Sequence, residues 1–154
     1  MKKLMIIGVV LIALVATIAT VKRVSPLSWG LWGTTNTTDG VALHGMDVVT
    51  YFTVVGPAQG NSEFSTTWAD AEWYFVSAEN RDLFAADPES YEPQFGGFCA
   101  FAASKGFTAH PAPEAWHIED QRLYLFADEG VRDEWVAGLP DGSLKRSEDN
   151  WAKR

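Results

Sequence analysis

The 154-residue chain contains one cysteine, Cys99, and only three histidines. A single thiol cannot form an internal disulfide, so Cys99 must be a free thiol, a metal ligand, an intermolecular partner or a buried small residue. The chain also lacks a phosphate-binding glycine loop, a His-Glu-x-x-His helix and a Gly-x-Ser-x-Gly turn. Without these signatures the sequence predicts no catalytic residues, and the balance of the evidence is against an enzyme.

Basic residues are also scarce. The four near the N-terminus leave eight for the rest of the chain, where all 20 acidic residues lie, so this part has a net charge of −12 with neutral histidines. Such a domain repels phosphate backbones, which excludes nucleic acid as a partner. The scattered acids favour solubility over the attraction of cations. No segment is repeated along the sequence.

The N-terminal segment is apolar from Leu4 to Val21 and is followed by Lys22 and Arg23. A helix of this length is about 27 Å long, close to the thickness of the hydrocarbon core. Residues 4–21 therefore predict a single membrane pass with the domain outside the cytoplasm. The alternative is a signal peptide cleaved near Thr17–Ala19, which would give a secreted or periplasmic protein.

Three regions are expected along the chain. Residues 1–23 form the signal-anchor or signal peptide. Residues 24–40 are rich in Ser, Thr, Gly and Asn without a periodic apolar pattern, which is typical of a tether. Residues 41–154 are long enough for one domain with a hydrophobic core.

The domain is predicted to be a compact α+β fold of short antiparallel strands and short helices. The expected strands are 48–55 and two hairpins, 64–68 with 72–76 and 116–118 with 123–126. The expected helices are 78–86 after Ser77, a short turn through Tyr91, 98–104, 128–137 and 144–151.

Several stretches together resemble the YHS domain family, in its exported, single-domain branch. The matching segments are Leu43–Phe52, Trp73–Tyr91, Gly96–Gly106, Glu114–Trp116, Leu123–Leu125 and Asn150–Trp151. The resemblance covers roughly residues 41–151, and its motifs are specific as a set. It implies a YHS-like fold and an association with metals.

The chain departs from the metal-associated members of that family. Their cysteines would fall at Val76, at Asn80 and in the turn that here reads His44-Gly45-Met46. These replacements remove the thiolate cluster, so a structural zinc site of four cysteines from one chain is excluded. The resemblance therefore implies the fold more firmly than the function.

The remaining metal-ligand candidates are Cys99 and His44. A thiolate and an imidazole suit copper or zinc, and His44 lies in the turn that carries a ligand in the family. Met46 would add a thioether for copper alone, and His117, in a predicted strand, is a further ligand candidate. The first hypothesis is thus a membrane-tethered or exported domain that binds copper or zinc.

Two alternatives stay open. Phe98 and Phe101 would bury Cys99 well, which would make it a structural cysteine in an interaction or small-ligand module of the cell envelope with an unidentified partner. A thiol enzyme would instead need Cys99 with a depressed pKa. Asp47 is expected to cap the preceding turn, and His110 is expected to be a solvated loop residue.

Overall fold

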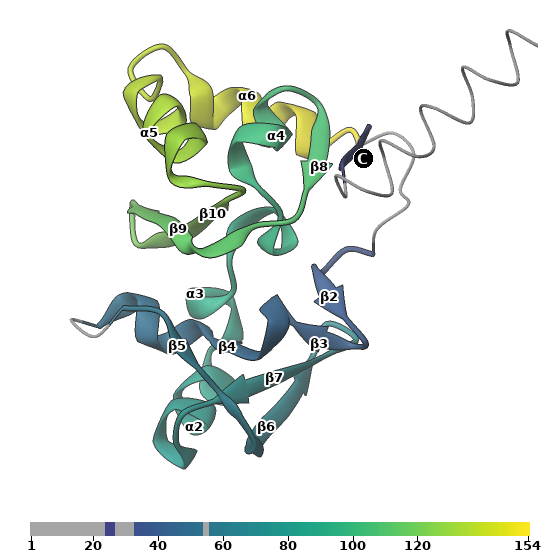
Figure 1. Ribbon diagram of the computed structural model, residues 1–154, viewed down its shortest axis with the longest axis vertical. Coiled ribbons are helices and arrows are strands. Elements are labelled where there is room, and N and C mark those ends of the chain that lie inside the picture. The colour runs from purple at the N-terminus through teal and green to yellow at the C-terminus, as the bar shows by residue number, and fades with distance from the viewer. Residues whose placement is uncertain (1–23, 27–32, 54–55) are drawn as a thin grey trace, which may run out of the picture.

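The structure, a computed structural model, describes residues 24–26, 33–53 and 56–154 (Figure 1). It confirms the α+β class, because short strands form small sheets beside short helices. The predicted apolar helix of the N-terminus lies outside the described residues. Within those residues, no helix has the length and apolar character needed to cross a membrane.

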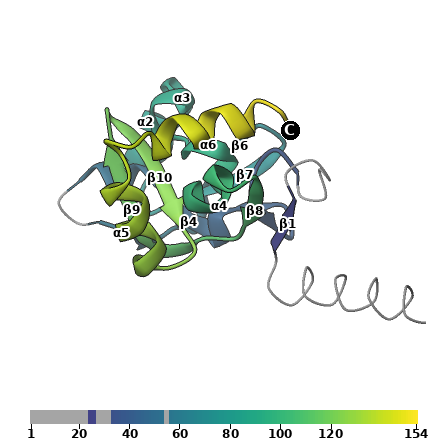
Figure 2. The same cartoon turned by 90° about the horizontal axis from the view of Figure 1, so that it is seen from above.

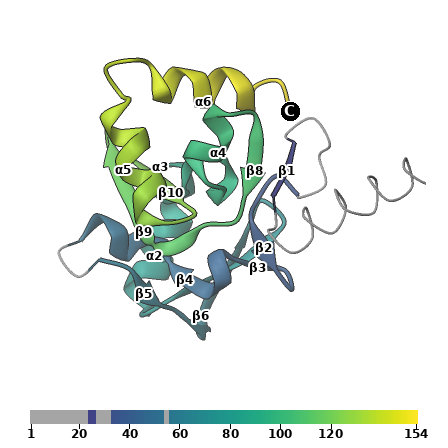
Figure 3. The same ribbon diagram turned by 45° about the horizontal axis from the view of Figure 1, so that its top comes forward.

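Two lobes make up the domain, and they are joined by α3 (Pro88–Tyr91) and the residues after it (Figures 1 and 3). The first lobe contains a four-stranded sheet in the order β2-β3-β7-β6, in which β3 and β7 are parallel. A short pair, β4-β5, and one longer helix complete it. Its elements are β2 (Thr37–Thr38), β3 (Val41–Ala42), η2 (Leu43–Gly45), β4 (Met46–Asp47), η3 (Val48–Phe52), β5 (Ala58–Gln59), β6 (Asn61–Trp68), β7 (Ala71–Phe75) and α2 (Ala78–Ala86).

The second lobe is a hairpin covered by helices. Strands β9 and β10 pair antiparallel, and β8 pairs with the N-terminal strand β1. Helix α6 lies across α4 (Figures 2 and 3), where the Ser147 hydroxyl donates to the carbonyl of Ala100 at 2.9 Å. The elements of this lobe are β1 (Val24–Pro26), η4 (Gln94–Gly97), α4 (Ala100–Ser104), β8 (Phe107–Ala109), β9 (Ala112–Glu119), β10 (Arg122–Phe126), α5 (Glu129–Ala137) and α6 (Ser143–Trp151).

Each lobe has its own aromatic core. In the first, Phe84 of α2 packs against Trp73 and Phe75 of β7, with ring centroids 5.0 and 5.3 Å apart. In the second, Trp135 of α5 packs against Tyr124 and Phe126 of β10 at 5.1 and 5.3 Å. All six rings are buried, so each helix is held to its hairpin mainly by the removal of aromatic surface from water.

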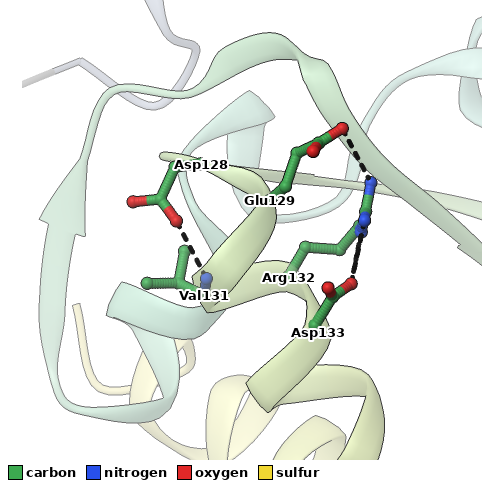
Figure 4. A network of polar contacts seen from close by, with 5 residues as sticks. All are labelled: Asp128, Glu129, Val131, Arg132 and Asp133. Carbon is green, nitrogen blue, oxygen red and sulfur yellow. Dashed lines mark hydrogen bonds and ion pairs between the residues drawn. The ribbon is translucent and has the colours of Figure 1, made fainter.

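Local sequence explains why these helices begin where they do. The Ser77 hydroxyl accepts the backbone N–H of Asn80 at 3.2 Å, and the Asp128 carboxylate accepts that of Val131 at 3.0 Å. Such caps satisfy amide groups that the first helical turn leaves unpaired. Figure 4 shows the second cap. Arg132 lies beside it, paired with Asp133 at 2.8 Å. Both predicted hairpins and the helices that follow them are confirmed.

The strand predicted at 48–55 is wrong over residues 48–53, and residues 54–55 lie outside the described part of the chain. Residues 48–52 form the 3₁₀ helix η3, although their β-branched and aromatic composition favours a strand. The Asp47 carboxylate accepts the backbone N–H of Val49 at 2.8 Å, and the Thr50 hydroxyl donates to the Asp47 carbonyl at 2.7 Å. These local bonds stabilise a turn over an extended chain.

Part of the predicted tether lies within the domain. Residues 24–26 form β1, and the buried Asn36 joins the two lobes. Its backbone N–H donates to the carbonyl of Gly96 at 2.7 Å, its side-chain amide donates to that of Gly97 at 3.1 Å, and its own carbonyl accepts the N–H of Leu43 at 3.1 Å. A polar composition therefore marks a buried hydrogen-bonding segment here, and not a free linker.

The two lobes repeat one backbone pattern that the sequence does not show. Leu43, His44 and Gly45 have left-handed φ values of 49°, 56° and 80°, and residues 95–97 have values of 57°, 60° and 77°. Each run is followed by an extended residue, a capping residue and a short helix. A hairpin and a nine-residue helix come next in both lobes. Position 47 in the first lobe thus corresponds to position 99 in the second.

Candidate functional site

Cys99 is a buried capping residue. Its side chain is 1 % exposed, and its sulfur accepts the backbone N–H of Ala102 at 3.5 Å as the N-cap of α4. It belongs to the core cluster that contains Phe95, Tyr124, Phe126 and Trp135. The thiol therefore performs a structural task in this lobe.

Burial controls the protonation of this thiol. It raises the pKa of Cys99 above its ordinary value, although the backbone N–H groups of Ala102, Ala127 and Phe101 act in the opposite direction. A reactive cysteine needs an accessible site and a lowered pKa. The geometry of Cys99 thus favours a neutral, protected thiol, which argues against the thiol-enzyme alternative.

His44 lies in η2 of the first lobe, while Cys99 is the N-cap residue before α4 in the second lobe. The His44 side chain is exposed, and its Nδ1 is 3.2 Å from the hydroxyl oxygen of Thr38. Met46 is half-buried and packs against the core of the first lobe. The contacts of these three predicted ligands are therefore separate.

His117 is half-buried on β9. Its Nε2 is 3.0 Å from a carboxylate oxygen of Glu119, and its ring centroid is 6.4 Å from that of Trp135. Across residues 24–26, 33–53 and 56–154, no three side chains of His, Cys, Asp or Glu form a group that could hold a metal ion. The candidate metal ligands thus each have a different protein environment.

The sequence predicts that Asp47 caps the turn before it, but its carboxylate caps η3, the 3₁₀ helix that follows. Besides capping η3, its carboxylate accepts the backbone N–H of Val76 at 2.9 Å and the side-chain amide of Asn80 at 2.7 Å. The residue is fully buried. It therefore connects the turn, the end of β7 and the start of α2.

The expectation of a solvated His110 is wrong. The imidazole packs edge-on against Phe98, with centroids 5.7 Å apart, and both of its ring nitrogens are shielded from solvent. The residue follows β8, which is covered on one edge by β1. The sequence shows only that His110 comes before a proline, Pro111, and this gives no indication that the side chain is packed.

An open hollow of about 960 Å³ lies where the two lobes meet. Both hairpin turns contribute to it, through Ala69 from the first lobe and Arg122 from the second. The rest of the lining comes from residues 33–35, residues 92–96, three residues at the C-terminal end of α6 and just after it (Glu148, Trp151 and Ala152), and Arg154. No single element makes this site, because its walls come from distant parts of the chain.

The hollow has an aromatic wall. Trp151 packs against Phe95 and Phe98 with centroids 5.8 and 6.1 Å away, and the Arg154 guanidinium lies 4.6 Å from the centroid of a Trp151 ring. Burial lowers the pKa of that guanidinium from its ordinary value. Arg154 also donates a hydrogen bond to the carbonyl of Gly33. These contacts hold the wall in a defined position.

The charged part of the lining consists of two acids and two bases. Glu92 accepts the indole N–H of Trp68 at 3.1 Å, so it is fixed to the hairpin of the first lobe. Arg122 and Glu148 are exposed, and neither forms a hydrogen bond or ion pair through its side chain with another described residue. Two charged groups of opposite sign are therefore available at one opening.

Sequence reasoning did not find the hollow. Its residues lie in short segments, in turns and at the end of α6, and they share no motif or spacing. The resemblance described above included Gly96 and Trp151, but it did not indicate that they line one site. Comparison of the chain with protein-family models, curated proteins and solved structures gives no match.

Proposed function

We propose that this chain is a membrane-tethered or exported module that binds a small molecule in the hollow between its lobes, with Cys99 as a structural residue. The observation that carries the proposal is the hollow itself. Its volume of about 960 Å³ falls within the range of roughly 300 to 1,000 Å³ that is typical of ligand sites. Junctions between structural units are common places for such sites.

The mixture of lining groups also supports binding. Phe95 and Trp151 offer apolar surface, while Arg122 and Glu148 offer charged groups that form no hydrogen bond or ion pair with another described residue. Ligand sites combine mostly apolar walls with a few polar groups that orient the ligand. The lining residues come from both hairpins, from α6 and from the segments 33–35 and 92–96, so distant parts of the chain hold the site together.

The burial of Cys99 favours this function over metal binding. A metal at the thiolate would have to displace the N–H bond from Ala102 and enter a core of aromatic rings. It would also need His44 or Met46 to leave their own contacts. Copper or zinc binding by these residues stays a prediction, and the experiment below separates it from binding in the hollow.

The experiment uses the full chain in a lipid nanodisc, labelled with 5-fluorotryptophan. The seven tryptophan signals are assigned by single Trp→Phe substitutions and followed by ¹⁹F NMR during the addition of a fragment library. We expect a subset of fragments to shift Trp151, which lines the hollow, and to leave the buried Trp135 unchanged. A library that shifts neither Trp151 nor Trp68, the indole donor to Glu92, would contradict the proposal.

The metal arm of the experiment adds Cu(I), Cu(II) or Zn(II) to the parent chain and to the Cys99→Ser and His44→Ala variants. If Cys99 is structural, the three proteins have equal affinity and stoichiometry for each metal. A loss of binding in both variants would favour the metal function. The fragment library is repeated on Cys99→Ser, which should keep the response of Trp151.

A further inference from the structure

We infer that the occupant of the hollow is a zwitterion with an aromatic body, of the class of free aromatic amino acids; this inference rests on the proposed function. It concerns the chemistry of the ligand, which the existence of the hollow does not define. Three features carry it: the charge balance of the lining, the two uncommitted side chains and the aromatic wall.

The charge balance of the hollow differs from that of the domain. The part of the chain after Arg23 has eight bases against 20 acids, yet the lining holds two of each, Arg122 and Arg154 with Glu92 and Glu148. An anion would meet the field of an acidic domain, and a cation would meet both guanidinium groups. A molecule with both charges and no net charge avoids each of these costs.

The committed and uncommitted groups define where the two charges would bind. Arg154 is engaged by Gly33 and Trp151, and Glu92 by Trp68. Arg122 and Glu148 have no such bonds to described residues. A guanidinium binds a carboxylate through two parallel N–H bonds, and a carboxylate binds an ammonium group. Arg122 would therefore hold the carboxylate of the ligand, and Glu148 its ammonium group.

The aromatic wall indicates the body of the ligand. The ring of Trp151 packs against Phe95 and Phe98 and lies beside the Arg154 guanidinium. The residue is half-buried and lines the hollow, so an entering ring would meet its remaining surface. Offset or edge-on ring pairs contribute about 0.5 to 1.5 kcal/mol beyond the area that they bury. An aliphatic zwitterion would lack this contribution, and a neutral aromatic compound would leave Arg122 and Glu148 without partners.

Four probes with one phenyl body test the inference: phenylalanine, 2-phenylethylamine, 3-phenylpropionate and N-acetylphenylalanine amide. They carry both charges, only the positive charge, only the negative charge and no charge. The full chain in nanodiscs is titrated with each, and the Trp151 signal gives the dissociation constant. Exposed ion pairs contribute little free energy. We therefore expect phenylalanine to bind only about three- to tenfold more tightly than each of the other three probes.

Variants assign the two charges. Arg122→Gln should weaken phenylalanine and 3-phenylpropionate by about threefold and leave the amine probe unchanged, while Glu148→Gln should do the reverse for the single-charge probes. Arg146→Gln is the control. Arg146 lies on α6, as Glu148 does, but it does not line the hollow. It should alter none of the constants.

Tightest binding by an uncharged or singly charged probe would overturn the zwitterion and leave the proposed function intact. So would an unchanged constant in both Gln variants. If none of the four probes shifts Trp151, the aromatic amino acid class is also overturned, and the fragment library alone decides the proposed function.

Discussion

Asp47 and Cys99 occupy equivalent positions in the two lobes. Each follows a run of three left-handed residues and an extended residue, and each caps the short helix that comes next. Each also interacts with the backbone N–H of the residue after the hairpin of its own lobe, Val76 for the carboxylate and Ala127 for the thiol. One structural task is thus performed by an oxygen acceptor in one lobe and by a sulfur acceptor in the other.

Replacement of Asp47 by alanine should strongly destabilise the protein. The substitution removes the acceptor of three N–H groups, from Val49, Val76 and Asn80, in a buried place. Each unsatisfied donor costs about 1 to 3 kcal/mol, so we expect the free energy of unfolding to fall by about 3 kcal/mol or more. Urea denaturation followed by tryptophan fluorescence measures it.

Asp82→Ala provides the control for that substitution. Asp82 is an exposed residue paired with Arg81 at 2.8 Å, and it has no buried donors to satisfy. Its removal should change the free energy of unfolding by about 0.5 kcal/mol or less. Equal losses in the two variants would show that the Asp47 bonds do not stabilise the first lobe.

Cys99 should resist thiol reagents while the protein is folded. The sulfur is buried, and its pKa is raised by burial, so few thiolates form near neutral pH and none is readily reached. Alkylation with iodoacetamide, quantified by mass spectrometry, should be far slower in native protein than in urea. Rapid native labelling near neutral pH would contradict a structural role and revive the thiol-enzyme alternative.

Alkaline pH should destabilise the fold. Burial raises the pKa of the Cys99 thiol and of the Tyr124 phenol, and burial together with Glu114 raises the pKa of the Tyr51 phenol. The folded state then binds these protons more tightly than the unfolded state, so stability is complete below the unfolded pKa values and decreases as pH rises through them. The free energy of unfolding should begin to decrease at about pH 8.5 to 9.

Two variants separate the contributions to this decrease. In Cys99→Ala, the free energy of unfolding should decrease less over the pH range in which a free thiol loses its proton. In Tyr51→Phe, it should decrease less at higher pH, where phenols lose theirs. The Tyr51 hydroxyl donates to the carbonyl of Pro113 at 3.0 Å, so the Phe variant also loses some stability at neutral pH. Urea titrations from pH 7 to 11 measure the free energy of unfolding at each pH. An increase with rising pH would contradict the prediction.

Gly96 should tolerate no side chain. A Cβ atom there would lie 1.8 Å from the carbonyl oxygen of Thr34, and the residue has a φ of 60°. Gly96 and Thr34 both line the hollow. Gly96→Ala must therefore displace residues 33–35. It should lower both the free energy of unfolding and the response of Trp151 to ligands. Thermal unfolding and ¹⁹F NMR report the two effects.

Gly106→Ala is the matched control for Gly96. Gly106 has a φ of 82° and no atom within 4 Å of an added Cβ, so this variant contains the left-handed strain without the clash. It should cost about 1 to 2 kcal/mol. If the two variants were equally stable, the close approach of Gly96 to Thr34 would not contribute to the fold.

Prediction from sequence succeeded where local signals agree. Ser77 and Asp128 mark helix starts through cap chemistry, and the following helices begin after them in the structure. The strand expected at 48–55 failed because the Asp47 carboxylate, through bonds to Val49 and to Val76 far along the chain, overrides the β propensity of that segment. A bond between distant residues leaves no periodic trace.

The candidate site was harder to predict for the same reason. The sequence draws attention to Cys99 as a metal-ligand candidate or a buried residue, and in the structure it is the buried N-cap of α4. The hollow joins Ala69, Arg122 and Trp151, which only the packing of the two lobes brings together. The repeat of the lobes is likewise a property of backbone angles and caps, because aspartate in one lobe is replaced by cysteine in the other.

The most direct measurement of the central claim is the ¹⁹F spectrum of the fluorotryptophan-labelled full chain during a titration with phenylalanine. The account predicts a saturable shift of the Trp151 signal, a constant Trp135 signal, and the same titration curve for Cys99→Ser. A spectrum unchanged by phenylalanine and by every library fragment, but altered by copper or zinc in a way that both Cys99→Ser and His44→Ala abolish, would contradict it.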